Sequence, residues 1–344
     1  MSKRKPKLVY FLRKPRALGN YSIEAYFGMV ANQMKADYDV IQIVMPFESK
    51  GVLPRLFNAL YCFFRQGDLN HITGDIHYVA ILLSRQKTIL TIHDCGALLE
   101  TKGLKKLLLQ YFWFSLPARC VSQITVISSA TKVDLLQYIR FSEERIHIIH
   151  TFIQSIFEYV PYTVKHNPST VKLLQLGTAP NKNIKRLAEG LEGLDVELTI
   201  VGKLNEETRS ALDESRIKYR SKEFRLSDFE VFQEYQSCDI VCFISTLEGF
   251  GMPIVEAQKV GRLVVTSAVS SMPEIAGEGA IFVDPFDVAS IRKGFMTAIE
   301  LLGAPYNLLE KAQRNALRFE PKAIAKSYAE LYKSMLKTTK LRYE

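Results

Sequence analysis

The sequence predicts an α/β protein with two doubly wound domains, each built on a parallel sheet. Three observations support this prediction. The length of 344 residues suits two domains of ordinary size, each with its own core. Short apolar runs, typical of buried parallel strands, alternate with helical stretches along the chain. The alternation stops at a polar, proline-containing segment, about residues 153–170, and then begins again, which indicates a linker.

The first domain is expected to hold six strands separated by helical segments. Its first apolar run, KLVYFL, is interpreted as a strand and not as a signal peptide, because no small-residue cleavage site follows it. A helix is predicted from about Ser22. The predicted strands are residues 7–12, 38–45, 69–74, 87–94, 122–128 and 145–152.

The second domain repeats this plan and ends in an amphipathic helix from about Pro321 to Leu336. Its predicted strands are residues 171–177, 196–202, 217–219, 240–245 and 262–267. The predicted boundaries are 1–160 for the first domain, 168–320 for the second and 321–344 for the terminal helix. Two doubly wound domains bind ligands at the carboxyl ends of their strands.

The most informative segment is STLEGFGMPIVEAQKVGR, residues 245–262, which follows an apolar strand. Its glycines let the backbone approach a ligand, and its proline suits the first turn of a helix. Backbone N–H groups and the helix N-terminus would then converge on one point and bind phosphate. Glu248 and Glu256 flank this point, and carboxylates recognise hydroxyls. The predicted ligand therefore carries both phosphate and sugar.

This segment resembles family 4 of the retaining glycosyltransferases, whose GT-B fold consists of two facing Rossmann-like domains. The similarity continues through Gly261 to Asp287. The resemblance implies that Glu248 contacts the transferred sugar, that Glu256 holds the ribose, and that a turn binds the diphosphate. The residues of that turn are Gly249, Phe250, Gly251, Met252 and Pro253. The alternative is that Glu256 only complements a helix dipole and Glu248 is a solvated loop acid.

A second motif, LLQLGTAPNKNIKRL, covers Leu173 to Leu187 and resembles the members of the family that build bacterial surface polysaccharides. Gly177 ends a strand, and Lys182 precedes a helix, where a lysine can neutralise a departing diphosphate. The family commonly has an arginine where this chain has Thr178, which leaves Lys182 to act with Arg186 or with an arginine of the first domain. The alternative is a surface lysine at a helix start.

Several further residues are candidates for the site. His93 ends a predicted strand of the first domain and, by resemblance, contacts the donor sugar and the reacting centre from across a cleft; the alternative is a structural histidine bonded by Asp94. The segment GDIHY, residues 74–78, is assigned to the acceptor side. Gly19, in a loop that departs from the family's paired glycines, and Arg225, near the expected base-binding segment, complete the donor-binding candidates.

The net charge of +9 is confined to the first part of the chain. Residues 1–150 hold 20 Lys and Arg against 11 Asp and Glu, whereas residues 151–344 hold 25 of each. Two segments of the basic part, 52–66 and 104–119, combine bulky apolar residues with cations. They predict contact with an anionic membrane surface, with Arg55, Lys105 and Lys106 towards the headgroups. The alternative is two ordinary amphipathic helices. No nucleic-acid-binding pattern is present.

The five cysteines contain no C-x-x-C pair, so free thiols in a reducing cytoplasm are expected, without a zinc site. No apolar run reaches the ~18 residues of a membrane span. The predicted location is therefore cytoplasmic, with peripheral contact at the inner face of the plasma membrane. No D-x-D metal motif lies in an expected cleft-facing loop, and no metal or resident cofactor is predicted.

The predicted activity is a metal-independent, retaining transfer of a hexose from a UDP- or GDP-type sugar to a hydroxyl of a glycan or lipid-linked acceptor. Glu248, Lys182 and His93 are the expected catalytic residues. Alternatives are an epimerase or hydrolase of nucleotide sugars on the same fold, and a non-catalytic sugar-binding relative. A nicotinamide-dependent oxidoreductase is disfavoured because no G-x-G-x-x-G follows the first strand.

Overall fold

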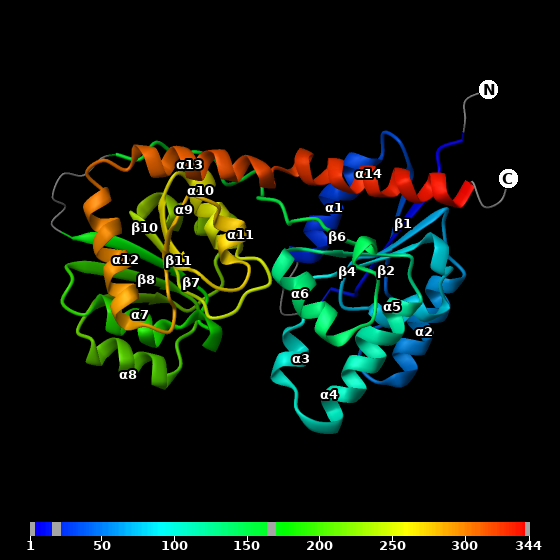
Figure 1. The fold of residues 1–344 in the computed structure, drawn as a ribbon, viewed down its shortest axis with the longest axis horizontal. Helices are drawn as coiled ribbons and strands as arrows, with labels where there is room; N and C mark the ends of the chain where they lie inside the picture. Colours follow the sequence, from blue (N-terminus) through cyan, green and yellow to red (C-terminus); the bar gives the residue numbers. More distant parts are fainter. Residues whose placement is uncertain (1–3, 16–21, 164–169, 341–344) are drawn as a thin grey trace. The chain divides into compact units, whose positions relative to one another are not determined.

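The computed structural model describes residues 4–15, 22–163 and 170–340, and the chain divides into two compact units (Figure 1). Unit 1 comprises residues 1–152 together with 321–344, and unit 2 comprises residues 153–320. Each unit contains a six-stranded sheet whose paired strands are parallel. The predicted α/β fold class with two parallel sheets is confirmed. None of the helices among the described residues combines the length and apolarity that a membrane span requires.

The sheet of unit 1 has the strand order β2-β1-β3-β4-β5-β6. All six predicted strands are present, most of them a few residues shorter than expected. They are β1 (Lys7–Leu12), β2 (Asp39–Val44), β3 (Leu69–Ile72), β4 (Thr88–Ile92), β5 (Gln123–Val126) and β6 (Ile146–Ile148). Strand β1 is almost continuously buried, as expected for a strand covered on both faces.

The helices of unit 1 cover both faces of this sheet. Helix α14 packs on α1 at one face, in a core that includes Leu8 and Tyr10, whereas Val9 and Phe11 face the opposite core. The helical segments are α1 (Ser22–Met34), α2 (Val52–Phe63), η1 (His77–Leu82), η2 (Arg85–Lys87), α3 (Gly96–Glu100), α4 (Gly103–Leu109), η3 (Gln110–Ser115), α5 (Leu116–Arg119), α6 (Ser129–Tyr138), η4 (Glu143–Arg145) and α14 (Pro321–Lys340).

A buried histidine fixes α14 to the sheet of unit 1. The Nδ1 atom of His71 lies 2.6 Å from the hydroxyl of Tyr332, and its Nε2 atom lies 2.7 Å from Oγ1 of Thr91. Burial lowers the pKa of His71 to about 3, so the ring stays neutral. A neutral ring can donate one of these hydrogen bonds and accept the other, which satisfies both nitrogens inside an aromatic core.

The sheet of unit 2 has the order β12-β11-β10-β7-β8-β9. Its strands are β7 (Val171–Leu176), β8 (Val196–Val201), β9 (Lys218–Lys222), β10 (Ile240–Phe243), β11 (Leu263–Ser267) and β12 (Ile281–Val283). Its helical segments are η5 (Pro180–Lys182), α7 (Ile184–Leu191), α8 (Glu206–Glu214), α9 (Asp228–Ser237), α10 (Met252–Val260), α11 (Met272–Ala276), α12 (Val288–Leu301), α13 (Tyr306–Ala316) and η6 (Leu317–Phe319).

The strand order of unit 2 determines which loops meet. Strand β10 lies between β7 and β11, and all three run in the same direction. The loops that leave their carboxyl ends therefore lie side by side at one edge of the sheet. These loops contain both informative motifs of the sequence, because Lys182 follows β7 and Glu248 follows β10.

Candidate functional site

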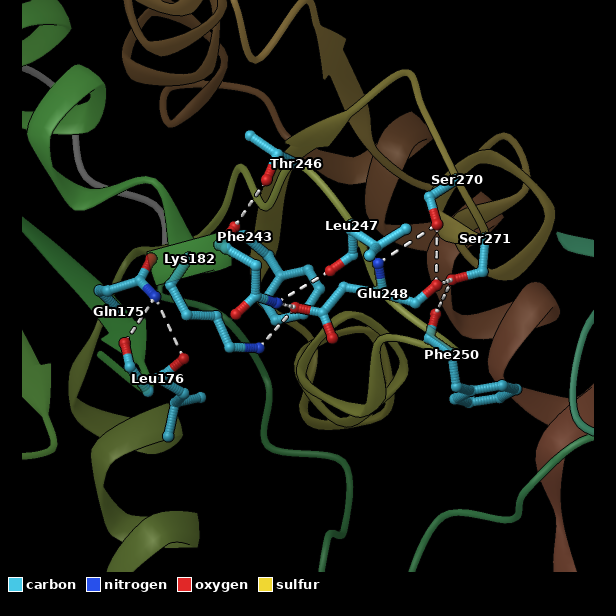
Figure 2. A network of polar contacts seen from close by, with 12 residues as sticks. Gln175, Leu176, Lys182, Phe243, Thr246, Leu247, Glu248, Phe250, Ser270 and Ser271 are labelled. Atoms are coloured by element: carbon cyan, nitrogen blue, oxygen red, sulfur yellow. Dashed lines mark hydrogen bonds and ion pairs between the residues drawn. The ribbon is translucent and has the colours of Figure 1, made fainter. Parts of the chain in front are cut away.

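The centre of the candidate site in unit 2 is an ion pair between the two sequence motifs (Figure 2). The Nζ atom of Lys182 lies 2.6 Å from Oε1 of Glu248, and both side chains are largely shielded, at 16% and 15% exposure. The ammonium group also lies 4.5 Å from the ring centroid of Phe243, which ends β10. A cation and a carboxylate from different loops are thus held together at the edge of the sheet.

Gly177 makes room for Lys182. Its φ is +84°, a left-handed conformation that side chains rarely adopt. A Cβ atom at this position would lie 3.0 Å from Cε of Lys182. The glycine at the end of β7 therefore allows both the turn of the backbone and the close passage of the lysine side chain.

Asn181 joins the two loops by contacts that the sequence analysis missed. Its Nδ2 group donates to Oε1 of Glu248 at 3.1 Å and to the carbonyl of Leu247 at 2.8 Å. Its own carbonyl accepts from the backbone N–H of Thr246 at 2.8 Å. The only signal in the sequence is its place beside Lys182, which does not reveal that its partners lie beyond β10.

Two serines after β11 hold the other side of the same turn (Figure 2). The hydroxyl of Ser270 donates to the carbonyl of Glu248 at 2.8 Å, and the backbone N–H of Glu248 lies 3.2 Å from the same oxygen. The hydroxyl of Ser271 donates to the carbonyl of Phe250 at 2.7 Å. Sequence reasoning missed these serines because their function depends on the adjacency of β10 and β11.

The glycine-rich turn leads into α10 as the sequence predicts. Gly251 is the residue before the helix, with a φ of +108°, and Pro253 lies in the first turn. A Cβ at Gly251 would lie 3.1 Å from Cδ1 of Ile254 and 3.3 Å from the ring of Phe243. Phe250 is buried, and its ring meets Phe319 edge-to-face at 5.6 Å. It therefore anchors the turn, in which Gly249 and Gly251 flank Phe250 and Met252 begins α10.

Glu256 lies one turn into α10 and is bonded to the neighbouring helix. Its Oε2 atom accepts a hydrogen bond from the hydroxyl of Tyr235 at 2.7 Å. Burial raises the pKa of Glu256 to about 7, with Asp228 adding to the increase and the Tyr235 bond opposing it. The assignment of Glu256 to the ribose stays a prediction, as does the alternative that it only complements the helix dipole.

Thr178, Arg186 and Arg225 are the other described donor-binding candidates of unit 2. Thr178 packs on Gly202, because a Cβ atom at Gly202 would lie only 2.9 Å from Cγ2 of Thr178. Arg186 donates to Oδ1 of Asn183 at 3.1 Å and lies over the ring of Phe286. These two residues line a cavity of about 220 Å³ that does not include Lys182 or Glu248. Arg225 is exposed in the segment between β9 and α9.

His93 belongs to unit 1, where it follows β4. Its Nε2 atom lies 2.9 Å from the carbonyl of Thr73, and burial lowers its pKa, an effect that this hydrogen bond opposes. Asp94, the partner that the alternative invoked, accepts instead from the N–H of Gly96 at 2.9 Å. The opposition of His93 and Glu248 across a cleft stays a prediction. Gly19 lies outside the described residues.

The remaining first-domain candidates are mostly engaged within unit 1. Arg13, in the basic N-terminal loop, contacts Glu24 at 2.7 Å and Asp75 at 2.8 Å. In the GDIHY segment, His77 and Tyr78 are buried, whereas the side chain of Asp75 is 44% exposed. In the part of the chain that the structure describes, His, Cys, Asp and Glu side chains form no group of three or more suited to a metal ion.

Comparisons with known proteins find similarity to glycosyltransferases. Residues 166–318 match the family model "Glycosyl transferases group 1". The chain is 30% identical over 186 residues to an MMP alpha-(1->4)-mannosyltransferase of Mycolicibacterium hassiacum, covering 50% of this chain and 44% of that protein. It is 26% identical over 192 residues to the serotype-specific mannosyltransferase WbdA of Escherichia coli, covering 49% and 23%. The chain thus spans less than half the length of these relatives.

A solved structure extends the similarity to the whole chain. Anabaena Alr3699/HepE, determined in complex with UDP and glucose, superposes with a TM-score of 0.72 at 18% identity, covering 96% of this chain and 100% of that one. At this identity the likeness concerns the fold alone. The chain therefore carries a glycosyl transferases group 1 domain within a GT-B fold.

Proposed function

We propose that this protein is a glycosyltransferase that moves a hexose from a nucleotide-diphosphate sugar to an acceptor hydroxyl. The observation that carries the proposal is the Lys182–Glu248 pair beside the N-terminus of α10. The lysine and the helix N-terminus supply the positive charge that binds a diphosphate. The carboxylate supplies oxygens that accept hydrogen bonds from the hydroxyl groups of a sugar. The mannosyltransferase relatives support transfer of a sugar, and the UDP complex of the HepE structure supports a nucleotide donor.

The reaction proposed is retaining and independent of a metal ion. The bond between the sugar carbon and the diphosphate breaks, and the acceptor oxygen bonds to the same face of that carbon. The acceptor proton passes to an oxygen of the departing phosphate, so no protein base is required. Negative charge grows on the leaving diphosphate, where Lys182 and the N–H groups of residues 249–252 would stabilise it most in the transition state.

Two carboxyl groups and one imidazole would position the donor. Glu248 would accept hydrogen bonds from sugar hydroxyls, and Glu256 would hold the ribose. His93 would support the reacting carbon from unit 1. When the donor binds, Lys182 would move at least partly away from Glu248 and contact the diphosphate. Glu248 would then contact the sugar hydroxyls in place of the lysine. The ion pair keeps both side chains in place before the donor arrives and compensates their partial burial.

The donor and acceptor classes follow from the same site and from the relatives. We propose a UDP- or GDP-type donor and a glycan or lipid-linked acceptor in the synthesis of a bacterial surface polysaccharide, as the serotype-specific relative supports. We also propose a cytoplasmic location with peripheral contact at the inner face of the plasma membrane. All five cysteines are free and four are buried, which suits a reducing compartment.

A thermal-shift panel of UDP, GDP, ADP and their sugar conjugates tests the donor. One nucleotide is expected to raise the melting temperature in a concentration-dependent way, because a ligand that binds the folded state stabilises it. Product analysis then separates the alternatives: an epimerase or hydrolase converts the donor alone, whereas a transferase needs an acceptor. A chain that binds no nucleotide sugar, or that consumes the donor fully without an acceptor, would not be this enzyme.

A further inference from the structure

Unit 1 exposes an extensive apolar surface on α2, α4 and η3. A surface helix ordinarily buries one apolar stripe and shows polar residues on its other side. Helix α2 buries Ala59 and Cys62, yet the side that faces solvent is apolar as well. We name these exposed residues the apolar platform: Val52, Leu53, Leu56, Phe57, Leu60, Phe63, Phe64, Leu104, Leu107, Leu108, Tyr111 and Phe112.

The helices of the platform are bridged by side chains and belong to one surface region of unit 1. The guanidinium of Arg55 on α2 lies 5.0 Å from the ring centroid of Trp113 on η3. Between them, Tyr78 of η1 lies 5.5 Å from the Trp113 ring and accepts a hydrogen bond from Nδ2 of Asn58 at 2.9 Å. Figure 1 shows α2 and α4 away from α14, and their core contacts place them on the opposite face of the sheet.

The exposure of the platform is large enough to require a partner. Val52, Leu53 and Leu104 are 78%, 67% and 71% exposed, and neighbouring turns of the same helices add further leucine and phenylalanine side chains. Single apolar residues are common on protein surfaces, but contiguous patches mark interaction sites. The platform is not the core-facing side of these segments, because α2 and η3 place Cys62 and Phe114 in the core of unit 1 and Leu109 at the end of α4 packs against that core.

The charge around the platform selects the kind of partner. Residues 49–67 and 101–133 contain eight Lys and Arg and no Asp or Glu. Arg55 and Lys106, which the sequence analysis directed towards lipid, lie over the rings of Trp113 and Tyr138 instead. Lys102 and Lys105 are exposed beside the platform. An anionic surface with an apolar interior complements this pattern, whereas a second copy of the chain would bring like charges together.

We propose that the apolar platform docks unit 1 on an anionic phospholipid bilayer and that the acceptor is a lipid-anchored glycan. The apolar side chains enter the boundary between headgroups and acyl chains, and Lys102 and Lys105 lie among the phosphates. The identity of the acceptor rests on the proposed function; the docking does not. A reaction that attaches a saccharide to a lipid must then precede this one.

Flotation with vesicles tests the docking. The protein is expected to float with vesicles of phosphatidylcholine and phosphatidylglycerol at low salt. Replacing Leu53, Phe57 and Leu107 by serine should weaken binding at least about tenfold, because three bulky apolar groups no longer enter the bilayer. The matched control replaces Phe224, Phe229 and Leu317 of unit 2, which are similarly exposed, by serine and should bind as the wild type does.

Charge reversal gives an independent measurement. Lys102→Glu with Lys105→Glu should weaken binding by about 25-fold or more, since each basic group near an anionic surface contributes about fivefold. Lys293→Glu, at an exposed site in unit 2, is the control. The docking is wrong if the wild type does not float at low salt, if platform and control variants float equally, or if the wild type self-associates through the platform without binding vesicles.

Two further measurements keep this inference apart from the proposed function. A nucleotide-dependent thermal shift that survives in the platform variant, together with loss of flotation, shows that donor binding and docking are separate properties. Flotation without any nucleotide response would overturn the proposed function and leave the docking intact. With a radiolabelled donor and a cellular lipid extract, label is expected in the organic phase; label only in water-soluble glycans would overturn the lipid-anchored acceptor.

Discussion

Helix α7 of unit 2 and helix α2 of unit 1 flank sheets of the same kind but use their apolar residues differently. In α7, Ile184, Leu187 and Leu191 are buried, and the exposed positions include Lys185 and Glu189. In α2, leucine and phenylalanine lie on the exposed side as well. Unit 2 brings Lys182 and Glu248 together at a polar edge of its sheet. Unit 1 leaves apolar side chains exposed, and these form the platform proposed to dock on a bilayer.

This difference suggests a division of labour in which unit 2 binds the donor and unit 1 brings the protein to the acceptor. The division predicts that substitutions in the polar edge of unit 2 change turnover without changing vesicle binding. It also predicts that substitutions in the apolar platform weaken vesicle binding without changing nucleotide binding. The variants below test the unit 2 side of this comparison, in order of decreasing effect.

Replacing Lys182 with alanine should have the largest effect. Turnover is expected to fall by roughly 10²–10³-fold, because an electrostatic group aimed at the leaving diphosphate is removed. Lys185→Ala is the matched control, since Lys185 is an exposed lysine three residues along the same segment. Steady-state kinetics and vesicle flotation are measured together. Turnover within a few-fold of wild type, or a loss of flotation, would break the proposed division.

The second prediction concerns the pH dependence of stability. Burial raises the pKa of Glu256 to about 7, above its ordinary value of 4.5, so the folded protein binds a proton that the unfolded chain has released between these values. Stability should therefore fall as pH rises from about 4.5 to about 7 and then level off, by on the order of 1–3 kcal/mol. Chemical denaturation at several pH values measures this change.

Glu256→Gln is the control for this titration, because the amide oxygen still accepts a hydrogen bond from Tyr235 but the side chain cannot ionise. The variant should lose this part of the pH dependence. An identical profile in wild type and variant would show that Glu256 is not the titrating group, and would remove the physical distinction between it and an ordinary helix-start acid.

The third prediction tests Asn181 as a positioning residue. Asn181→Ala removes the donor that holds Oε1 of Glu248 and the carbonyl of Leu247, which should lower kcat about tenfold. Ser237→Ala, at an exposed site on α9 away from the turn, is the control. If Asn181 positions the sugar contact, kcat falls while the nucleotide-dependent thermal shift stays unchanged. A lowered melting temperature of the free protein together with the loss of activity would instead indicate general destabilisation.

The sequence predicts the fold class and most strands because apolar runs, turn residues and their alternation are local patterns. It also predicts that Lys182 and Glu248 belong to one ligand site, a role that stays a prediction. It does not predict their mutual ion pair, or the contacts of Asn181, Ser270 and Ser271, because these depend on the order β11-β10-β7 within the sheet. Phe250 and Arg186 show the same limit, since packing against Phe319 and Phe286 determines where they lie.

The smallest predicted effect uses two glycines of unit 2 that share a left-handed backbone. Gly177 and Gly193 have φ values of +84° and +73°, but a Cβ at Gly177 would press on Lys182, whereas a Cβ at Gly193 has no neighbour within 4 Å among the described residues. Alanine at either site should destabilise the fold by about 1 kcal/mol through backbone strain. Only Gly177→Ala should also displace Lys182 and reduce turnover. Equal activity in both variants would show that the passage of Lys182 over the glycine is not required for transfer.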